Sequence, residues 1–217
     1  MGYRYPRLEY LRKWPVAVPS GRLIYDDGEA PEAFYRVESG CIRLQKHRHD
    51  GRRQILAFCL PGDVFGLDFC EFRPMAAEAA AASKLTRFSI HQDFRDGGDC
   101  SALLAESSRI TGALSETLIV FNLSSASDRV VWFLNWLAER QGAWQGSARV
   151  VHLPMNRLDI ADYLGLAPET LSRTLTQLVA AHRIRKRGRT IWLGAPCQRS
   201  QTPVGQLPES YLSALRG

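Results

Sequence analysis

The stretch DIADYLGLAPETLSRTL, residues 159–175, predicts two short amphipathic helices that meet at a tight turn. Ile160 and Leu164 lie on one apolar face of the first helix. Gly165 can adopt the left-handed backbone conformation that ends a helix. Pro168 suits the first position of the second helix, where its missing N–H leaves no hydrogen bond unmade. The stretch therefore predicts a helical hairpin.

The second helix has an apolar side and a polar side. Leu171, Leu175 and Leu178 recur at helical spacing and must face the partner helix. The polar side carries Glu169, Ser172, Arg173 and Thr176. Glu can accept a hydrogen bond from cytosine N4, and Arg can bind guanine O6 and N7, so this side suits the major groove of DNA. A hairpin with a solvated charged face is the alternative, and the rest of the chain decides between the two.

The distribution of charge favours the first interpretation. The 217-residue chain has a formal net charge of +6. Residues 149–199 hold nine Lys and Arg against three acids, so this segment alone accounts for the excess and the remainder is close to neutral. A basic segment attached to a neutral one is typical of a nucleic-acid-binding module joined to another domain.

The composition is that of a soluble globular protein, with 45% hydrophobic and 23% charged residues. No run of 18 apolar residues occurs, so we expect no membrane span. The N-terminus lacks an apolar signal region, and the five cysteines contain no CxxC pair. We therefore expect a cytoplasmic protein.

Five segments follow one another along the chain. A basic arm is followed by short strands between turn signals, typical of an antiparallel barrel or jelly-roll, and then by a long helical stripe. The expected segments are the N-terminal arm (1–17), a β-roll domain (18–100), a dimerisation helix region (101–140), a DNA-binding domain (148–195) and a C-terminal tail (196–217). The apolar stripe of the helix region consists of Leu103, Ile110, Leu114, Leu118 and Phe121. Residues 141–147 are expected to be a short polar connection, and 150–153 a strand.

A basic hairpin follows the helix pair directly. Residues 183–193 predict two strands around a turn at Gly188, with five Lys or Arg among apolar residues. Apolar side chains of such a wing pack inward and its cations can meet DNA phosphates. A solvated hairpin is the alternative, but its position after the helix pair favours a winged helix-turn-helix.

With these elements in this order, the chain resembles the CRP/FNR family of bacterial transcription regulators over residues 18–193, and it is most similar to the FixK branch. The residues that carry the resemblance are RLDIADYLGL (157–166), ETLSR (169–173), DGRRQI (50–55) and LPGDVFGL (60–67). The resemblance implies an α+β fold: an antiparallel β-roll like that of cyclic-nucleotide-binding domains, a long dimerisation helix and a C-terminal winged helix-turn-helix.

The resemblance also implies a homodimer that binds a palindromic operator with TTGA-type half-sites, activates transcription and contacts RNA polymerase. Glu169, Ser172 and Arg173 match the family's base-reading set. Expected phosphate contacts are Arg157, which matches a family arginine, together with Thr170, Thr176, Arg185, Lys186, Arg187 and Arg189. The apolar stripe would form the dimer interface. Ala167 is a departure, because relatives usually carry a Thr or Ser that caps the recognition helix.

Four hypotheses concern what the β-roll domain senses. A cyclic nucleotide needs an Arg for its phosphate, usually followed by Ser or Thr, whereas in residues 69–78 the only Arg, Arg73, is followed by Pro74. An iron–sulfur cluster needs four closely spaced thiolates, and the spacing of Cys41, Cys59, Cys70 and Cys100 fits small buried apolar residues better. Haem could use His47, His49 or His91, and a haem or nitric-oxide sensor stays an alternative, as does a cyclic-nucleotide sensor.

The sequence favours the fourth hypothesis, a regulator without a small-molecule effector, cofactor or metal ion. Cys197, just after the wing, is a candidate redox thiol, although nothing around it beyond Arg199 distinguishes it. An enzyme is not expected, because the chain has no GxGxxG, P-loop, HExxH or GxSxG motif. Asp63 and Asp68 could be imagined as a carboxylate pair, but a barrel turn explains them better.

Overall fold

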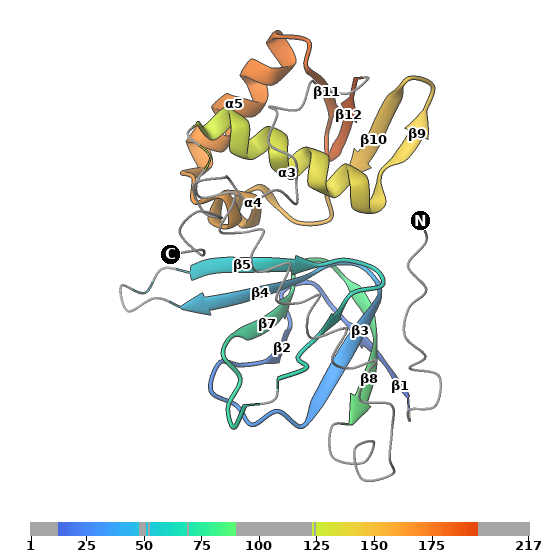
Figure 1. The fold of residues 1–217 in the computed structure, drawn as a ribbon, viewed down its shortest axis with the longest axis vertical. Helices are drawn as coiled ribbons and strands as arrows, with labels where there is room; N and C mark the ends of the chain where they lie inside the picture. The colour runs from blue at the N-terminus through green and yellow to red at the C-terminus, as the bar shows by residue number, and fades with distance from the viewer. Residues whose placement is uncertain are drawn as a thin grey trace, which may run out of the picture.

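The structure is a computed structural model that describes residues 13–47, 51, 53–68, 70–89, 123 and 125–194. Figure 1 shows two domains, a β-roll formed by the N-terminal strands and a mixed domain of helices and strands above it. The expected dimer-interface residues Leu103, Ile110, Leu114, Leu118 and Phe121 lie outside the described residues, as does Cys197.

The β-roll consists of two antiparallel four-stranded sheets, so the expected β-roll fold is confirmed. One sheet has the strand order β1-β8-β3-β6, with β1 Trp14–Val18, β8 Ser83–Ser89, β3 Ala33–Ser39 and β6 Val64–Phe65. The other has the order β2-β7-β4-β5, with β2 Leu23–Tyr25, β7 Ala76–Ala79, β4 Ile42–His47 and β5 Arg53–Cys59.

Alternation of apolar and polar residues explains how the two sheets enclose a core. Val37 of β3 and Leu85 of β8, in the first sheet, are buried in one cluster with Leu44 of β4 in the second sheet. The first strand begins at Trp14, so the roll starts before the expected boundary at residue 18. The reason is that residues 14–18 pair in register with β8, which local sequence cannot reveal.

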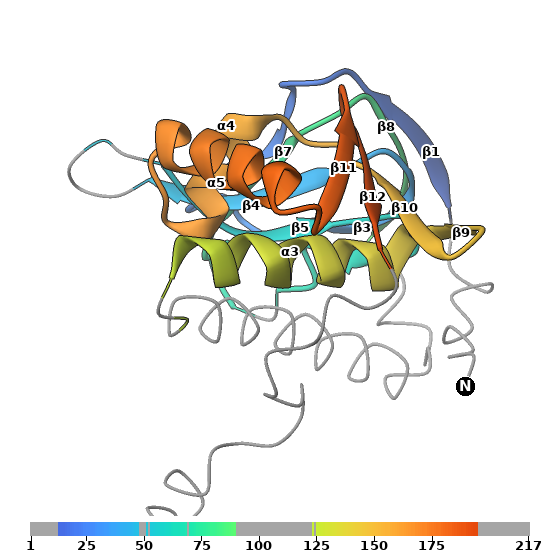
Figure 2. The same cartoon turned by 90° about the horizontal axis from the view of Figure 1, so that it is seen from above.

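The C-terminal domain contains three described helices and a four-stranded sheet. The helices are α3 Ala126–Gln141, α4 Arg157–Leu164 and α5 Pro168–Ala180. The sheet has the order β11-β12-β10-β9, with β11 Ile184–Arg187, β12 Thr190–Leu193, β10 Ala148–His152 and β9 Ala143–Gln145. Figure 2 shows α3 running alongside α5 and the strands of this sheet.

Helix α3 belongs to the C-terminal domain rather than to the helix region in which its residues were expected. The Ser125 hydroxyl caps it by accepting a hydrogen bond from the Asp128 N–H at 3.1 Å. Its buried residues include Phe133 and Leu137, and it packs against α5 and β10. The domain boundary expected at residue 148 therefore lies one helix too late, because amphipathicity shows which residues are buried but not what covers them.

Residues 141–147, expected to be a polar connection, contain the short strand β9. This strand pairs with β10 around Gly146, which has a φ of 62°. All three residues of β9 are exposed, so the strand has no pattern of apolar residues by which sequence could reveal it. No helix among the described residues is long and apolar enough to cross a membrane.

The two domains share one apolar cluster. It joins Ile55, Phe58 and Leu60 of the β-roll to residues of α3 and α4. The ring of Phe58 lies 5.2 Å from that of Tyr163 in α4 and 6.3 Å from that of Phe133 in α3, measured between centroids. Packing of this kind holds the C-terminal domain against the β-roll.

Candidate nucleic-acid interface

The first helix of the predicted hairpin, α4, begins and ends as its sequence indicates. The Asn156 side chain accepts a hydrogen bond from the Asp159 N–H at 2.8 Å, which caps the N-terminus of the helix. Gly165 ends the helix with φ 63° and ψ 37°, the left-handed conformation that glycine adopts most readily. Only residues 165–167 then separate α4 from α5.

The second helix, α5, buries the face that its leucines predict. Leu171, Leu175 and Leu178 are all buried, and Pro168 occupies the first turn. Ala167 stands at the N-cap and provides no side-chain hydrogen bond to the helix. The start of α5 is therefore uncapped, as expected.

The opposite side of α5 is accessible. Glu169 and Arg173 are exposed at the start of the helix, and Ser172 is half-buried between them. Thr176, one turn further on, is exposed and its hydroxyl donates to the Ser172 carbonyl at 3.0 Å. Thr170 is half-buried. The residues expected to read bases thus share an exposed helix surface.

Strands β11 and β12 form the predicted wing. Gly188 makes the turn with a φ of 60°, and Lys186 pairs with Ile191. The Leu153 N–H donates to the Arg189 carbonyl at 2.9 Å, which ties the tip of the wing to the chain that leads into α4. Arg187 and Arg189 are both exposed next to the turn.

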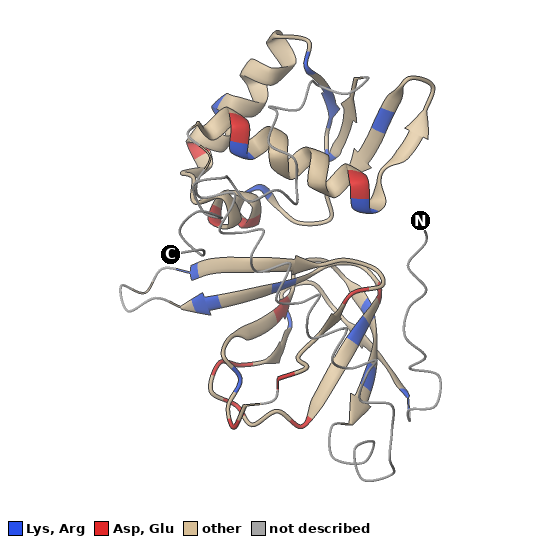
Figure 3. Cartoon of the chain, viewed as in Figure 1, with Lys and Arg blue, Asp and Glu red and all other residues tan. Residues whose placement is uncertain are grey.

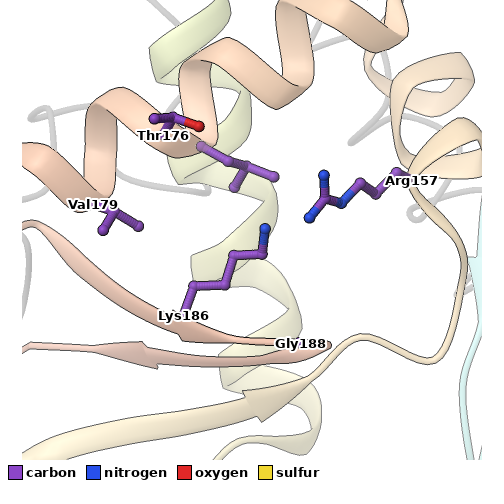
Figure 4. Close-up of a pocket in the computed structure, with 6 residues that line it drawn as sticks. Arg157, Thr176, Val179, Lys186 and Gly188 are labelled. Carbon is purple, nitrogen blue, oxygen red and sulfur yellow. The ribbon is translucent and has the colours of Figure 1, made fainter.

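A cleft of about 300 Å³ lies between α4, α5 and the wing. Its lining is Arg157, Leu175, Thr176, Val179, Lys186 and Gly188. Figure 4 shows the charged ends of Arg157 and Lys186 directed toward one another across this cleft. Partial burial and the neighbouring charge of Arg157 lower the pKa of Lys186 below its ordinary value. Two cations that face each other in an open cleft suit an anionic ligand.

The wing does not direct all of its cations into this cleft. Side chains of a strand alternate between its two faces, so Arg185 and Lys186 point to opposite sides. The Arg185 guanidinium lies 6.0 Å from the ring centroid of Trp192, on the side away from the cleft. Of the expected phosphate contacts, the structure brings together Arg157, Thr176 and Lys186 and leaves Arg185 apart from them.

Two family models match the chain in the order of its domains. The model of the cyclic nucleotide-binding domain matches residues 15–96, and that of the Crp-like helix-turn-helix domain matches residues 128–195. The second match begins within α3, in agreement with the packing of that helix on the C-terminal domain.

Curated relatives agree with both matches over most of the chain. The nitrogen fixation regulation protein FixK of Azorhizobium caulinodans is 43% identical over 169 residues, which cover 76% of this chain and 68% of the relative. FixK of Rhizobium meliloti is 36% identical over 180 residues, which cover 79% and 81%.

The chain belongs to the CRP/FNR family of transcription regulators.

Solved structures support the same family and fold. FixK2 from Bradyrhizobium japonicum is 33% identical, with a TM-score of 0.77 over 84% of this chain and 93% of that one. A CooA mutant from Carboxydothermus hydrogenoformans, at 18% identity and a TM-score of 0.66, shares the fold. The relatives are regulators rather than enzymes, and the chain is accordingly a DNA-binding transcription regulator of the FixK type.

The β-roll of this CRP/FNR protein holds an arginine in its interior. Arg73 is only 3% exposed, and its guanidinium lies 3.7 Å from the ring centroid of Tyr25. Nη2 donates to the Ala33 carbonyl at 2.6 Å, while Nη1 donates to the Asp68 carboxylate at 2.9 Å and the Gly66 carbonyl at 3.2 Å. Arg73, in the stretch examined for a nucleotide phosphate, is therefore held by partners of its own chain.

The residues around Arg73 leave just enough space for its guanidinium. Gly66 has a φ of 74°, and a Cβ at that position would lie 2.9 Å from Arg73 Nη1. Burial, with the charge of Asp68 nearby, raises the pKa of Tyr25 well above its ordinary value. Burial also raises the pKa of Asp68, although the charge of Arg73 opposes this shift.

The described cysteines differ in environment. Cys41 and Cys59 are buried in apolar clusters, which confirms the interpretation of these two as small core residues. Burial raises the pKa of the Cys41 thiol far above its ordinary value. Cys70 is exposed instead, and its thiol donates to the Phe72 carbonyl at 3.0 Å.

Sequence reasoning missed the acids of α4. Figure 3 shows acidic residues on α4, the helix that contacts strand β5 of the β-roll. Asp159 is completely buried and Asp162 is partly buried, and both pair with arginines of the β-roll. Counting the charges of residues 149–199 could not assign a role to these acids, because their partners are more than a hundred residues away in the sequence.

Proposed function

We propose that this regulator binds, as a homodimer, a palindromic operator with TTGA-type half-sites and activates transcription there without a small-molecule effector. The observation that carries the proposal is the set of Glu169 and Arg173, both exposed, with the half-buried Ser172 between them on α5, beside the cationic cleft between α5 and the wing.

In this proposal the side chains of α5 read base edges in the major groove. Arg173 would form two hydrogen bonds with guanine O6 and N7, and Glu169 would accept one from cytosine N4. A TTGA half-site paired with its complement offers both groups. Ser172, between the two, would supply a hydroxyl that can donate or accept.

The cationic cleft and the wing tip would bind the DNA backbone. Arg157 and Lys186 face one another across the cleft and would bind the same phosphate, and Thr176 lines the same cleft. Arg187 and Arg189 at the wing tip, and Thr170 near the start of α5, are further proposed phosphate contacts. These contacts would fix the register of the protein on DNA and carry most of the salt-dependent affinity.

Homodimerisation follows from the small footprint of one recognition helix. A single helix reads only a few base pairs, whereas two helices related by two-fold symmetry give the affinity of a specific regulator. The apolar stripe from Leu103 to Phe121 is the proposed dimer contact, and the part of the expected helix region that forms α3 is not included in it.

Activation is supported by analogy with one relative, and we propose RNA polymerase in the cytoplasm as the partner. The transcriptional activatory protein AadR of Rhodopseudomonas palustris is 31% identical over 159 residues, which cover 71% of this chain. An activator would act by contacting the polymerase at the promoter.

The state of Arg73 supports control without a cyclic nucleotide. A nucleotide phosphate would need a guanidinium that is free to bind it, but that of Arg73 is bound to Asp68, Gly66 and Ala33 and stacked on Tyr25. Binding would have to break these contacts and move Arg73 out of a buried position. A haem- or nitric-oxide-responsive regulator remains the second candidate.

Fluorescence anisotropy with labelled duplexes tests the DNA-binding proposal. The full chain should bind a TTGA–TCAA palindrome far more tightly than a scrambled duplex of the same composition. Its affinity should fall steeply between about 50 and 200 mM salt. Equal affinity for both duplexes would contradict the proposed operator.

Two measurements test the absence of an effector. Isothermal titration with cyclic AMP should give no heat of binding, and the absorption spectrum of protein purified without oxygen should show neither a Soret band nor an iron–sulfur shoulder. The same protein, with no ligand added, should also bind the operator duplex. A spectral band, or an operator affinity that depends on added nucleotide, would overturn the effector-free proposal.

A further inference from the structure

The surface between the β-roll and α4 contains a cluster of charged side chains, here called the interdomain ion cluster. It consists of Arg43, Arg53 and Glu78 of the β-roll and Asp159 and Asp162 of α4. Arg43 lies on β4 and Arg53 on the neighbouring strand β5. Figure 1 shows α4 above β5, the strand with which it is in contact.

Asp159 is the centre of the cluster. Arg43 Nη1 donates to both of its carboxylate oxygens, at 3.1 and 3.0 Å, and Arg53 Nη2 donates to Oδ1 at 2.9 Å. The Asp159 side chain is completely buried, so these hydrogen bonds replace the water that a carboxylate requires. Arg43 in turn bonds to Glu78 and, through Nε, to Gln45 at 3.1 Å.

Asp162, one turn further along α4, extends the cluster toward solvent. Arg53 Nε and Nη2 both donate to Asp162 Oδ2, at 3.0 and 2.6 Å. Burial alone would lower the pKa of Arg53, but the hydrogen bonds and charges of Asp162 and Asp159 raise it above its ordinary value. Gln54 adds a hydrogen bond from Nε2 to the Asp162 carbonyl at 2.9 Å.

A second ionic contact holds α3. Arg140 near its end pairs with Asp63, which lies in the turn between β5 and β6. The apolar contacts of Phe58 with Phe133 and Tyr163 lie on the same surface. Directional charged contacts therefore accompany the non-directional apolar ones where α3 and α4 meet the β-roll.

The orientation of α4 determines that of α5. Only residues 165–167 connect the two helices, and they pack together around Leu164 and Leu171. A buried ion cluster is a weak source of stability, because its desolvation opposes its Coulomb energy, but it can select one arrangement over others. We propose that Arg43 and Arg53 are positioning residues for DNA recognition: by holding α4 to the β-roll they set the direction of α5 and the separation of the two recognition helices in the dimer.

This inference rests on the proposed palindromic operator and homodimer. When the interdomain ion cluster is intact, the two recognition helices of the dimer are held at the distance that fits half-sites of one spacing. When the cluster is broken, α4 and α5 populate several orientations, and the affinity for the operator falls in proportion to the fraction that remains competent. A protein without the cluster also binds more easily to half-sites whose spacing differs from that of the operator.

The test is a charge exchange at Arg53 and Asp162, whose side chains are 21% and 23% exposed and so tolerate substitution. The variants are R53E, D162R and the double variant, with R53Q as a milder change and R36E as the control. Arg36 forms a surface pair with Glu38 within β3, away from α4. Anisotropy would give the dissociation constant for the operator and for duplexes with one base pair more or fewer between the half-sites.

We expect R53E to bind the operator about tenfold more weakly and to lose most of its preference between spacings. R53Q should show the same change to a smaller extent, and R36E should match the wild type. The double variant should recover both properties in part, because the exchange restores the ion pair with position 162 but not the hydrogen bond from Arg53 to Asp159. Thermal unfolding of each variant checks that the compared proteins are folded.

Two results would overturn the inference. One is an unchanged preference between spacings in folded R53E or R53Q, and the other is a double variant no better than the single ones. Failure of the proposed function would look different, because the wild type itself would then not prefer the palindrome to scrambled DNA.

Discussion

At the scale of single residues, Arg173 and Arg187 are proposed to contribute differently to DNA binding. Arg173 is exposed at the start of α5, whereas Arg187 is exposed next to the wing turn. Arg173→Ala should lower the affinity for the operator by about 1–3 kcal/mol and remove discrimination at one base pair per half-site. Arg187→Ala should weaken operator and scrambled DNA about equally and reduce the salt dependence. Equal losses from both substitutions on both duplexes would contradict the division of roles.

We expect Lys186 to make DNA binding dependent on pH. Its pKa in the free protein lies below the ordinary value of 10.5, and a bound phosphate favours the charged form. Affinity should therefore be full at neutral pH and fall as alkaline pH approaches the lowered pKa, where Lys186 loses its proton. Lys186→Arg should bind with a flatter profile, because guanidinium stays charged. Anisotropy at several pH values measures this, with Lys84→Arg, on β8 and outside the cleft, as a control.

At the scale of secondary-structure elements, a substitution at the start of α5 should increase the stability of the protein. Ala167 stands at the N-cap without a side-chain hydrogen bond, so Ala167→Ser should stabilise the protein by about 1 kcal/mol. The change should appear as a higher denaturation midpoint in urea with an unchanged slope. Ala180→Ser, at the other end of the same helix, offers no free N–H to cap and is the control. An equal effect of both substitutions would show that capping is not the cause.

The wing shows how strand alternation distributes function within an element. Lys186 lines the cleft with Arg157, while Arg185 packs against Trp192 on the other face. From the sequence, Arg185 and Lys186 were both expected to contact DNA phosphates, because they are adjacent in the basic hairpin. Their separation depends on the register of β11 with β12, in which Lys186 pairs with the buried Ile191.

At the scale of the whole molecule, the two domains are joined tightly enough that a substitution between them should affect the stability of both. Asp159→Asn removes a charge that both arginines share, and leaves the buried Arg43 and the partly buried Arg53 with one charged partner fewer. The free energy of unfolding should fall by about 3 kcal/mol or more. Urea unfolding measures this, with Asp27→Asn at an exposed pair with Lys46 as the control, for which less than about 1 kcal/mol is expected. A loss for Asp159→Asn as small as that of the control would mean that the ion cluster does not hold the domains.

The sequence by itself determined the features that depend on neighbouring residues. Helix α4 ends at Gly165, α5 begins at Pro168 and buries Leu171 and Leu175, and the wing turns at Gly188. Each is specified by contacts within about four residues, by backbone preferences or by an amphipathic period, which are readable along the chain. The same signals, with the family resemblance, led to the fold and to the exposed face of α5.

Only the tertiary structure decided which distant residues meet. Arg43 and Asp159 are 116 residues apart in the sequence, and Arg73 and Ala33 are 40 apart, yet each pair is hydrogen-bonded in a buried site. Nothing local distinguishes Asp159 from a solvated helix acid, or Arg73 from an arginine free to bind a phosphate. Which side chains are buried, and which residues they bond to, is decided only when the elements pack. The contacts of Arg73 inside the β-roll and the interdomain ion cluster at α4 are therefore visible only in the folded chain.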